Sequence, residues 1–154
     1  MPHIHEKIDF IADVYVIYNS TVLLRKHDKY KKWFSVGGHV ELDEDPNQAA
    51  LREVKEEVGL DIELFCEKPL FDSKNPNFKH LIPPIFLDRH RINPNHEHIG
   101  MVYFATSKSN KIIEPDNEKS EGCKWFTMDE LDSNTEIPPD VLFYAKEALR
   151  RVKK

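Results

Sequence analysis

The strongest constraint on the fold is one helix whose two ends are both marked in the sequence. Asp45 suits the N-cap position, Pro46 suits the first helical position, and Gln48 completes a capping-box pattern. Gly59 supplies the left-handed residue that ends many helices. We therefore predict a helix over Pro46–Val58, and any fold of this chain has to accommodate it.

The predicted helix has two unlike faces when its residues are placed about 100° apart. Its core side would carry Leu51, Val54 and Val58, with Ala50 at the edge. The opposite arc carries three carboxylates at i, i+3 and i+4, namely Glu53, Glu56 and Glu57. Like charges at this spacing cost a few tenths of a kcal/mol per pair, and Mg²⁺, which prefers oxygen ligands, would relieve that cost. A solvated acidic face is the alternative interpretation.

The residues just before the helix favour a cation site. Gly37 and Gly38 give flexible backbone whose carbonyl groups could turn toward the same cation. Glu44 lies between the glycines and the helix, where it could pair with Arg52. Such a pair would fix the loop against the helix and leave Glu53 available to a metal ion. Together these features predict one site.

The rest of the chain indicates a mixed α/β (α+β) domain packed in layers. Phe10–Tyr18 and Thr21–Arg25 are rich in β-branched and aromatic residues and predict a hairpin with a tight turn at Asn19-Ser20. Further strands are expected over Ile62–Phe65, Ile82–Leu87, Met101–Thr106 and Gly122–Phe126. A short helical turn over 127–130 and an amphipathic helix over Val141–Val152 are expected near the end of the chain. Strands therefore dominate, with two good helices beside them.

Length and composition narrow the class of protein. The chain has 154 residues, 40% of them hydrophobic and 32% charged, which predicts a single globular domain over 1–154 rather than a disordered or fibrous chain. A net charge of −5 argues against non-specific nucleic-acid binding. We expect a cytoplasmic protein with reduced thiols at Cys66 and Cys123, no signal peptide and no membrane partner. Apolar residues on the last helix or the hairpin could bury within the monomer or form a homodimer.

The region from 38 to 60 resembles the signature of the Nudix (MutT-like) hydrolases. Gly38 is followed by five residues, Glu44, seven residues, and then the run from Arg52 to Leu60, so that every fixed position is met across 23 residues. A looser resemblance covers Trp33–Glu41 and Trp125-Phe126. Val36 departs from the pattern, because many members have Pro before the two glycines.

This resemblance implies an α/β/α sandwich with a mixed sheet, in which the signature forms a loop–helix–loop. It also implies cleavage of a phosphoanhydride in a nucleoside diphosphate linked to another group, with Mg²⁺ or Mn²⁺ as cofactor. The implied metal ligands are Glu53, Glu56, Glu57 and the carbonyl group of Gly37. Glu44 and Arg52 would mainly orient the catalytic groups.

The implied reaction is attack of a metal-activated water on phosphorus. Glu53 or Glu56 would accept the proton, and some members of the family use an acid from a distant loop instead. The candidates for such an acid here are Glu114, Asp116, Glu118 and Glu121. We prefer Glu118 as a further metal-binding acid, and a solvated acidic turn is the alternative.

Three residues are candidates for substrate binding. Arg25 ends a strand that leads toward the glycines and could meet a phosphate, although it could equally be an ordinary surface arginine. His39 lies inside the signature loop. His98 belongs to a His96-Glu97-His98 pattern that resembles a metal motif, but no further histidine stands at a structural zinc spacing. We therefore expect this segment to line the substrate pocket rather than to bind zinc.

The expected substrate is a nucleoside triphosphate, modified or not, which would be cleaved to a monophosphate and pyrophosphate. ADP-ribose or a sugar nucleotide is the second candidate. Pro76 stands about where some ADP-ribose-cleaving members carry a proline, but the residues around it do not match the usual small-residue context, so we discount it. A diadenosine polyphosphate is the third. A non-catalytic nucleotide sensor is the alternative from another class, but the signature acids are all present and no helix-turn-helix segment is visible. No nucleic acid is expected as a partner.

Overall fold

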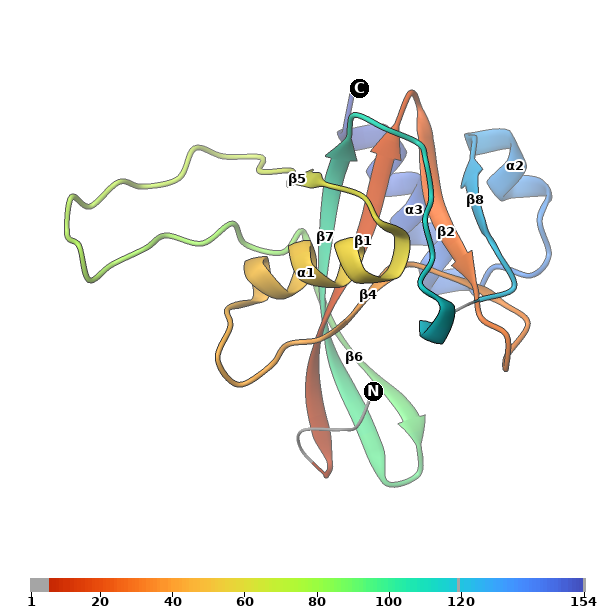
Figure 1. Ribbon diagram of the computed structural model, residues 1–154, viewed down its shortest axis with the longest axis horizontal. Coiled ribbons are helices and arrows are strands. Elements are labelled where there is room, and N and C mark those ends of the chain that lie inside the picture. Colours follow the sequence, from red (N-terminus) through yellow and green to blue (C-terminus); the bar gives the residue numbers. More distant parts are fainter. Residues whose placement is uncertain (1–5, 119, 154) are drawn as a thin grey trace.

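The computed structural model describes residues 6–118 and 120–153, with Glu118 described by its backbone only. Its centre is an eight-stranded mixed sheet (Figure 1). The strands are β1 (Ile8–Tyr18), β2 (Thr21–Lys26), β3 (Trp33–Phe34), β4 (Val36–His39), β5 (Ile62–Leu64), β6 (Phe86–Asn93), β7 (His96–Ser107) and β8 (Cys123–Phe126). The helices are α1 (Pro46–Val58), α2 (Met128–Ser133) and α3 (Pro139–Arg151), with a short 3₁₀ helix at Asp116–Glu118.

Strand β1 organises the sheet. It runs parallel to β7 along most of its length and antiparallel to both β2 and β4. Strand β4 pairs with the first half of β1, at Ile11–Val14, and β2 pairs with its last residues. Strands β5 and β6 add to β7, while β3 and β8 add to β2. The short strand β4 thus brings the two signature glycines to the middle of the molecule.

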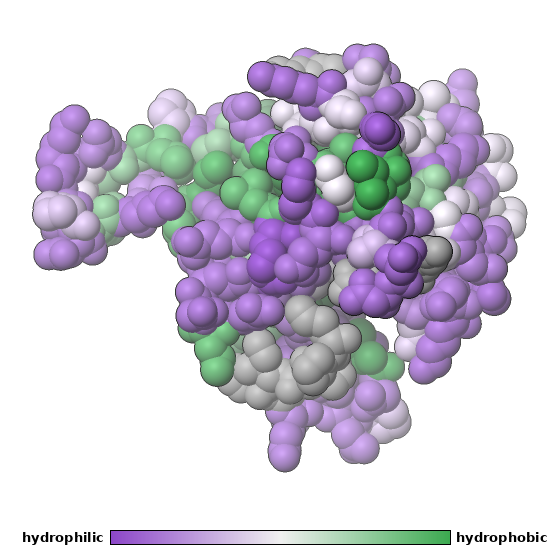
Figure 2. All heavy atoms as spheres, viewed as in Figure 1, coloured by the Kyte–Doolittle hydropathy of each residue, from purple (hydrophilic) through white to green (hydrophobic). Residues whose placement is uncertain are grey.

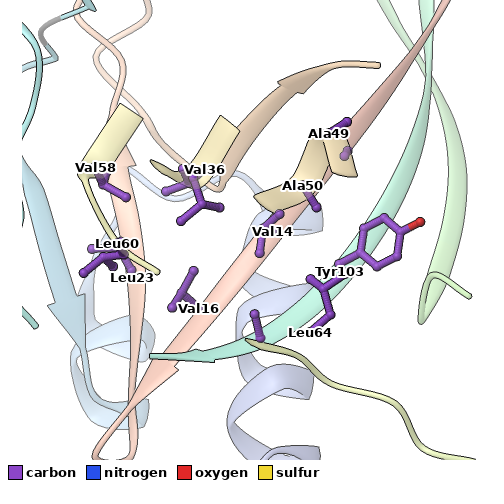
Figure 3. Packing of buried hydrophobic residues seen from close by; sticks show 13 residues of the cluster. Val14, Val16, Leu23, Val36, Ala49, Ala50, Val58, Leu60, Leu64 and Tyr103 are labelled. Atoms are coloured by element: carbon purple, nitrogen blue, oxygen red, sulfur yellow. The ribbon is translucent and has the colours of Figure 1, made fainter. Parts of the chain in front are cut away.

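Two layers of helices cover the sheet, which confirms the predicted α/β/α sandwich. Figure 1 shows α1 across one face and α3 across the other. Beneath α1, the side chains of Ala49, Ala50 and Val58 pack against Val14 and Val16 of β1 (Figure 3). On the opposite face, α3 packs through a second apolar cluster. Burial of these two apolar stripes is the main stabilising term for such a layered fold.

The predicted ends of α1 are confirmed. Asp45 accepts a hydrogen bond from the backbone N–H of Gln48, and the Gln48 side chain accepts one from the N–H of Asp45. Gly59 ends the helix at φ 74°, in the left-handed region. One detail of the apolar face is wrong, because Leu51 is 42% exposed and Ala49 is buried in its place.

Two other local predictions need correction. The strand expected over Ile82–Leu87 begins only at Phe86, because Pro83 and Pro84 lack the N–H groups that a strand ladder uses. The two glycines lie within β4 rather than in a loop. Gly37 has φ 151°, and a Cβ there would lie 1.9 Å from the backbone oxygen of Ala12, so only glycine fits this position.

The segment between β5 and β6 extends away from the sandwich (Figures 1 and 2). It is anchored near its end by Asn47, whose side chain exchanges hydrogen bonds with the backbone of Ile82. The predicted hairpin turn is confirmed at Asn19 and Ser20, which have φ 44° and 60°. Among the described residues, no helix is both long and apolar enough to cross a membrane.

Candidate active site

The three acids of α1 differ in burial, since Glu53 is buried, Glu57 is half-buried and Glu56 is exposed. Glu53 is only 4% exposed, and its carboxylate lies directly under Gly38. A Cβ at position 38 would be 2.5–2.7 Å from the carboxylate atoms of Glu53. Gly38 therefore allows the backbone of β4 to approach this acid closely, which brings helix and strand into one site.

Arg52 holds the signature together from beside the acids. It donates to Glu44 from Nε and Nη2, at 3.0 and 2.6 Å, so the predicted pair is present. It also donates from Nη1 to Glu53 at 2.9 Å and to Glu56 at 3.1 Å, and from Nη2 to the carbonyl of His39. Arg52 therefore contacts Glu53 as well as Glu44, and the availability of Glu53 to a metal ion stays a prediction. Hydrogen bonds from Arg52 lower the pKa of Glu44 and keep that acid ionised.

A second arginine, Arg25, also forms hydrogen bonds with the acids of the site. Its Nη1 donates to Glu57 at 2.9 Å and its Nε to Glu114 at 3.0 Å, while the N–H of Gly37 donates to Glu57 at 2.9 Å. Burial raises the pKa of Glu114, but hydrogen bonds from Ser120 and Arg25 outweigh it and hold that pKa below its ordinary value. A distant loop therefore reaches the acids through Glu114.

Glu118, the distal acid that the sequence favoured, lies in the 3₁₀ helix of the same loop. Its side chain lies outside the described residues, so its role stays a prediction. Glu114 was among the sequence candidates, but nothing in the sequence showed that Arg25 would join it to Glu57. That juxtaposition depends on β2 and the loop before β8 lying side by side, which Lys26 and Gly122 secure by a backbone hydrogen bond.

A cleft of about 550 Å³ opens beside these groups. Its lining includes Arg25, Gly37, Gly38, His39, Glu53 and Glu57. Carboxylate oxygens from one helix face and the backbone of β4 form its wall, and this all-oxygen donor set fits a hard divalent cation. Arg25 and Arg52 both contact these acids and offset part of their negative charge.

A second cavity, of about 410 Å³, adjoins the cleft. Both cavities share His27, Phe34 and Ser35 as lining residues. The second cavity also contains three acids that the sequence analysis missed, namely Asp13, Asp88 and Asp140. The sequence feature that could have revealed this cavity is Asp13, a carboxylate inside the otherwise apolar segment Ile11–Ile17.

Asp13 and its neighbours differ chemically from the signature acids. Burial raises the pKa of Asp13 to about 6, and Ser35 donates to its carboxylate at 3.3 Å. The Tyr144 hydroxyl donates to Asp88 at 2.6 Å, and His90 Nδ1 lies 2.8 Å from the other oxygen of Asp88. Asp13 and Asp88 therefore bond to hydroxyls and an imidazole, although Arg91 also lines the cavity.

The two histidines expected at the substrate are found together. His39 lines the cleft, but His98 is not among the residues that line it. Their imidazole rings lie 5.2 Å apart between centroids, and both lie beside Asp9 of β1. The sequence missed this cluster because its members come from three separate strands.

Comparisons with known proteins place the chain in a family. The model of the NUDIX domain matches residues 10–146. The chain belongs to the Nudix family. A curated relative, dihydroneopterin triphosphate diphosphatase from Haemophilus influenzae, is 32% identical over 130 residues, which are 81% of this chain and 80% of the relative.

Solved structures agree. A NUDIX-family hydrolase from Clostridium perfringens superposes with a TM-score of 0.83 and 34% identity, over 94% of this chain and 98% of that one. The MutT protein from Methanosarcina mazei Go1 has a TM-score of 0.71, and the match covers 98% of this chain and 99% of that one. At 14% identity, this second likeness supports the fold alone.

As a Nudix protein, the chain is a pyrophosphohydrolase of a family that generally depends on a divalent metal and acts on small nucleotide substrates. The oxygen-rich cleft is where such a cation fits. Pro76, the feature that suggested ADP-ribose, lies on the extended segment between β5 and β6 and is not among the residues lining either cavity. The structure therefore gives that substrate no support from Pro76.

Proposed function

We propose that this Nudix hydrolase, a single domain, converts the triphosphate of a guanine-like or pterin-like compound to the monophosphate and pyrophosphate, with Mg²⁺ as cofactor. The observation that carries the proposal is that the two cavities share His27, Phe34 and Ser35 in their linings. The acidic cleft suits a cation and phosphates, and the adjoining cavity suits a flat heterocycle. Phe34 and Ser35 border both, so one extended substrate can occupy the two at once.

The second cavity favours a ring that is rich in N–H donors. Guanine and pterins share a 2-amino-4-oxopyrimidine edge, which presents a ring N–H beside an amino group. An ionised carboxylate accepts hydrogen bonds and cannot donate them. Asp13, Asp88 and Asp140 therefore complement an edge that presents N–H donors. Tyr15 and Phe34 add aromatic surface for the ring. The relative from Haemophilus influenzae is a diphosphatase of a pterin triphosphate, which supports this choice of substrate.

The signature cleft supports the choice of cofactor. Glu53, Glu56, Glu57 and the Gly37 carbonyl would hold Mg²⁺, because these donors are oxygens and Mg²⁺ prefers oxygens. The bound cation would neutralise phosphate charge and lower the pKa of water. Arg25, held between Glu57 and Glu114, is placed to meet a phosphate oxygen from the side opposite Arg52.

Glu53 is our choice for the group that accepts the proton from the attacking water. It is the most buried of the three acids, and both Arg52 and the backbone at Gly38 restrict the position of its carboxylate. A proton acceptor works best when it is held in one orientation. Glu44 contributes by fixing Arg52, and therefore acts as a positioning residue.

A product analysis with Mg²⁺ tests the proposed function. The panel comprises dihydroneopterin triphosphate, GTP, ATP, ADP-ribose, a UDP-sugar and diadenosine tetraphosphate, with release of pyrophosphate and of phosphate measured separately. We expect monophosphate and pyrophosphate from the first two compounds, and no turnover after chelation of the metal.

Two results would contradict the proposal. Faster cleavage of ADP-ribose or the UDP-sugar would replace the substrate class with the second candidate. If the folded protein hydrolysed none of these compounds, the interpretation as a non-catalytic nucleotide sensor would be favoured. The Asp140→Asn variant serves as a control for the ring pocket, because it should slow guanine and pterin substrates more than ATP.

A further inference from the structure

Among the residues that the structure describes, one carboxylate and two imidazoles form a cluster of potential metal ligands outside the signature acids. Ligand atoms of Asp9, His39 and His98 all lie within 4.8 Å of one another. Asp9 is 1% exposed and His39 is 8% exposed. This cluster lies on the opposite end of β4 from Val36, and the Nudix chemistry described above does not use it.

The sheet itself brings these residues together. Asp9 pairs with His98 across the parallel β1–β7 ladder, and Ile11, two residues along the same face of β1, pairs with His39 of β4. The rings of His39 and His96 each lie edge-on to His98, with centroids 5.2 and 5.1 Å away. Three neighbouring strands therefore fix the cluster, so its geometry does not depend on a loop.

The spacing of the ligand atoms suits a tetrahedral ion. Oδ2 of Asp9 lies 3.4 Å from Nε2 of His39 and 3.2 Å from Nε2 of His96. Two ligand atoms that are each about 2.0–2.1 Å from a tetrahedral Zn²⁺ are about 3.3–3.4 Å apart. The distance between Asp9 and His39 therefore already matches the edge length of such a site, and the ligand atoms of all three residues lie within 4.8 Å of one another.

The hydrogen bonding of His96 orients its ring toward the same carboxylate. Its Nδ1 lies 2.8 Å from the carbonyl oxygen of Glu6, which can only accept, so Nδ1 carries the hydrogen. This leaves Nε2 facing the carboxylate of Asp9 at 3.2 Å. A third imidazole therefore borders the cluster.

We propose that Asp9, His39 and His98 form a second, structural metal site for a divalent transition-metal ion, with Zn²⁺ as the expected ion and His96 beside the same carboxylate. Imidazole and carboxylate together suit Zn²⁺, whereas the all-oxygen signature site suits Mg²⁺. The ion would tie β1 and β7 to β4, the strand that carries Gly37 and Gly38. Its binding would stabilise the fold rather than supply the reaction.

The test uses tag-free protein carrying Glu56→Gln and Glu57→Gln, which removes two of the three signature acids and so weakens metal binding at that site. Zn²⁺ is titrated by calorimetry, and Co²⁺ is added separately as a spectroscopic probe of four-coordinate geometry. We expect one equivalent of Zn²⁺ to bind, a visible absorption band from tetrahedral Co²⁺, and a higher melting temperature with Zn²⁺. Absence of a stoichiometric complex in this folded protein would overturn the proposal.

Matched substitutions locate the ion. His98→Gln should weaken Zn²⁺ binding by more than about 100-fold, beyond the effect of changing an outer-sphere group. His90→Gln is the control, because the His90 ring also contacts His98, at 5.5 Å, but is not one of the three ligands. Equal binding by the two variants would refute the site. If His98→Gln does not fold, Asp9→Asn takes its place.

The outcome is independent of the proposed function. Failure of the Mg²⁺-dependent reaction would leave Zn²⁺ binding in the Glu56→Gln and Glu57→Gln protein unchanged. Failure of Zn²⁺ binding would leave the substrate panel unchanged. The two proposals can therefore be refuted separately.

Discussion

Two groups of acids lie on either side of strand β4, and their surroundings give them opposite properties. The signature acids contact arginines: Arg52 reaches Glu53 and Glu56, and Arg25 reaches Glu57. The acids of the second cavity contact hydroxyls and imidazole instead, as the bonds from Ser35 to Asp13 and from Tyr144 to Asp88 show. The carboxylates of the cleft are thus surrounded by groups that favour their charged form. The carboxylates of the second cavity are surrounded by groups that form hydrogen bonds with them.

The difference follows from electrostatics. A carboxylate beside a guanidinium stays ionised and gains strength as a ligand for a cation. A carboxylate recessed among rings loses hydration, so its proton leaves less readily, as the pKa of about 6 for Asp13 shows. We infer that the first group serves the phosphates through a metal ion and that the second group distinguishes one ring from another. Substitutions in each group should therefore affect different kinetic constants.

The largest expected effect comes from removing one charge in the signature group. Glu57→Gln keeps the shape of the side chain and the acceptor for the Gly37 N–H, but loses a charge at the proposed metal site. If that charge supplies several kcal/mol to the transition state, kcat should fall by roughly 10³-fold. Steady-state kinetics at saturating Mg²⁺ measure this fall in kcat.

The matched variant in the other group is Asp140→Asn, which should mainly raise KM, by about tenfold, the value of one hydrogen bond to a charged group. If Glu57→Gln raised only KM, or Asp140→Asn abolished kcat, the division of labour between the two groups would be wrong. Circular dichroism of both variants verifies that the fold is intact.

An intermediate effect is expected from Arg52→Lys. Lysine keeps one positive charge but cannot bond Glu44, Glu53 and Glu56 together, because it lacks the planar fork of arginine. We expect kcat to fall by about 10–100-fold and the free energy of unfolding to fall by about 1–3 kcal/mol. Chemical denaturation and kinetics provide the two measurements. An unchanged kcat would show that Arg52 serves stability alone.

The signature helix could be predicted in detail because its determinants are local. The capping residues, the glycine at its end, the pairing of Glu44 with Arg52 and the acidic face all follow from spacing within a single segment. The layered fold was also predictable, since its apolar strands and its amphipathic last helix show ordinary periodicities. Leu51 was the exception, because helical periodicity alone does not show how far the sheet extends beneath the helix.

The second cavity and the metal cluster could not be predicted, because both depend on the register between distant strands. Asp13 and Asp88 come from strands that meet only through the β1–β7–β6 order. His39 reaches Asp9 only because β4 pairs with the first half of β1. A single sequence shows which residues are unusual, such as a carboxylate in an apolar strand, but not which of them become neighbours.

The smallest expected effect is on the pH dependence of stability, and it comes from Asp13 of the second cavity. Asp13 has a pKa of about 6 in the folded protein against an ordinary 3.8, so between these values the folded state holds more protons than the unfolded state. The stabilising contribution of the protonated form is complete below pH 3.8 and is lost as pH rises through 6. The difference corresponds to at most roughly 3 kcal/mol, and solvent in the cavity should reduce it to about 1–2 kcal/mol.

Asp13→Asn should remove this part of the pH dependence. Its free energy of unfolding, measured by urea denaturation from pH 4 to pH 8, should fall less over that range than that of the wild-type protein. Ser35→Ala is the complementary variant, because the Ser35 hydrogen bond lowers the pKa of Asp13 and its loss should move the decline in stability to higher pH. Identical profiles for wild type and Asp13→Asn would show that Asp13 is ionised as readily as the signature acids. The two groups would then differ in position but not in charge state.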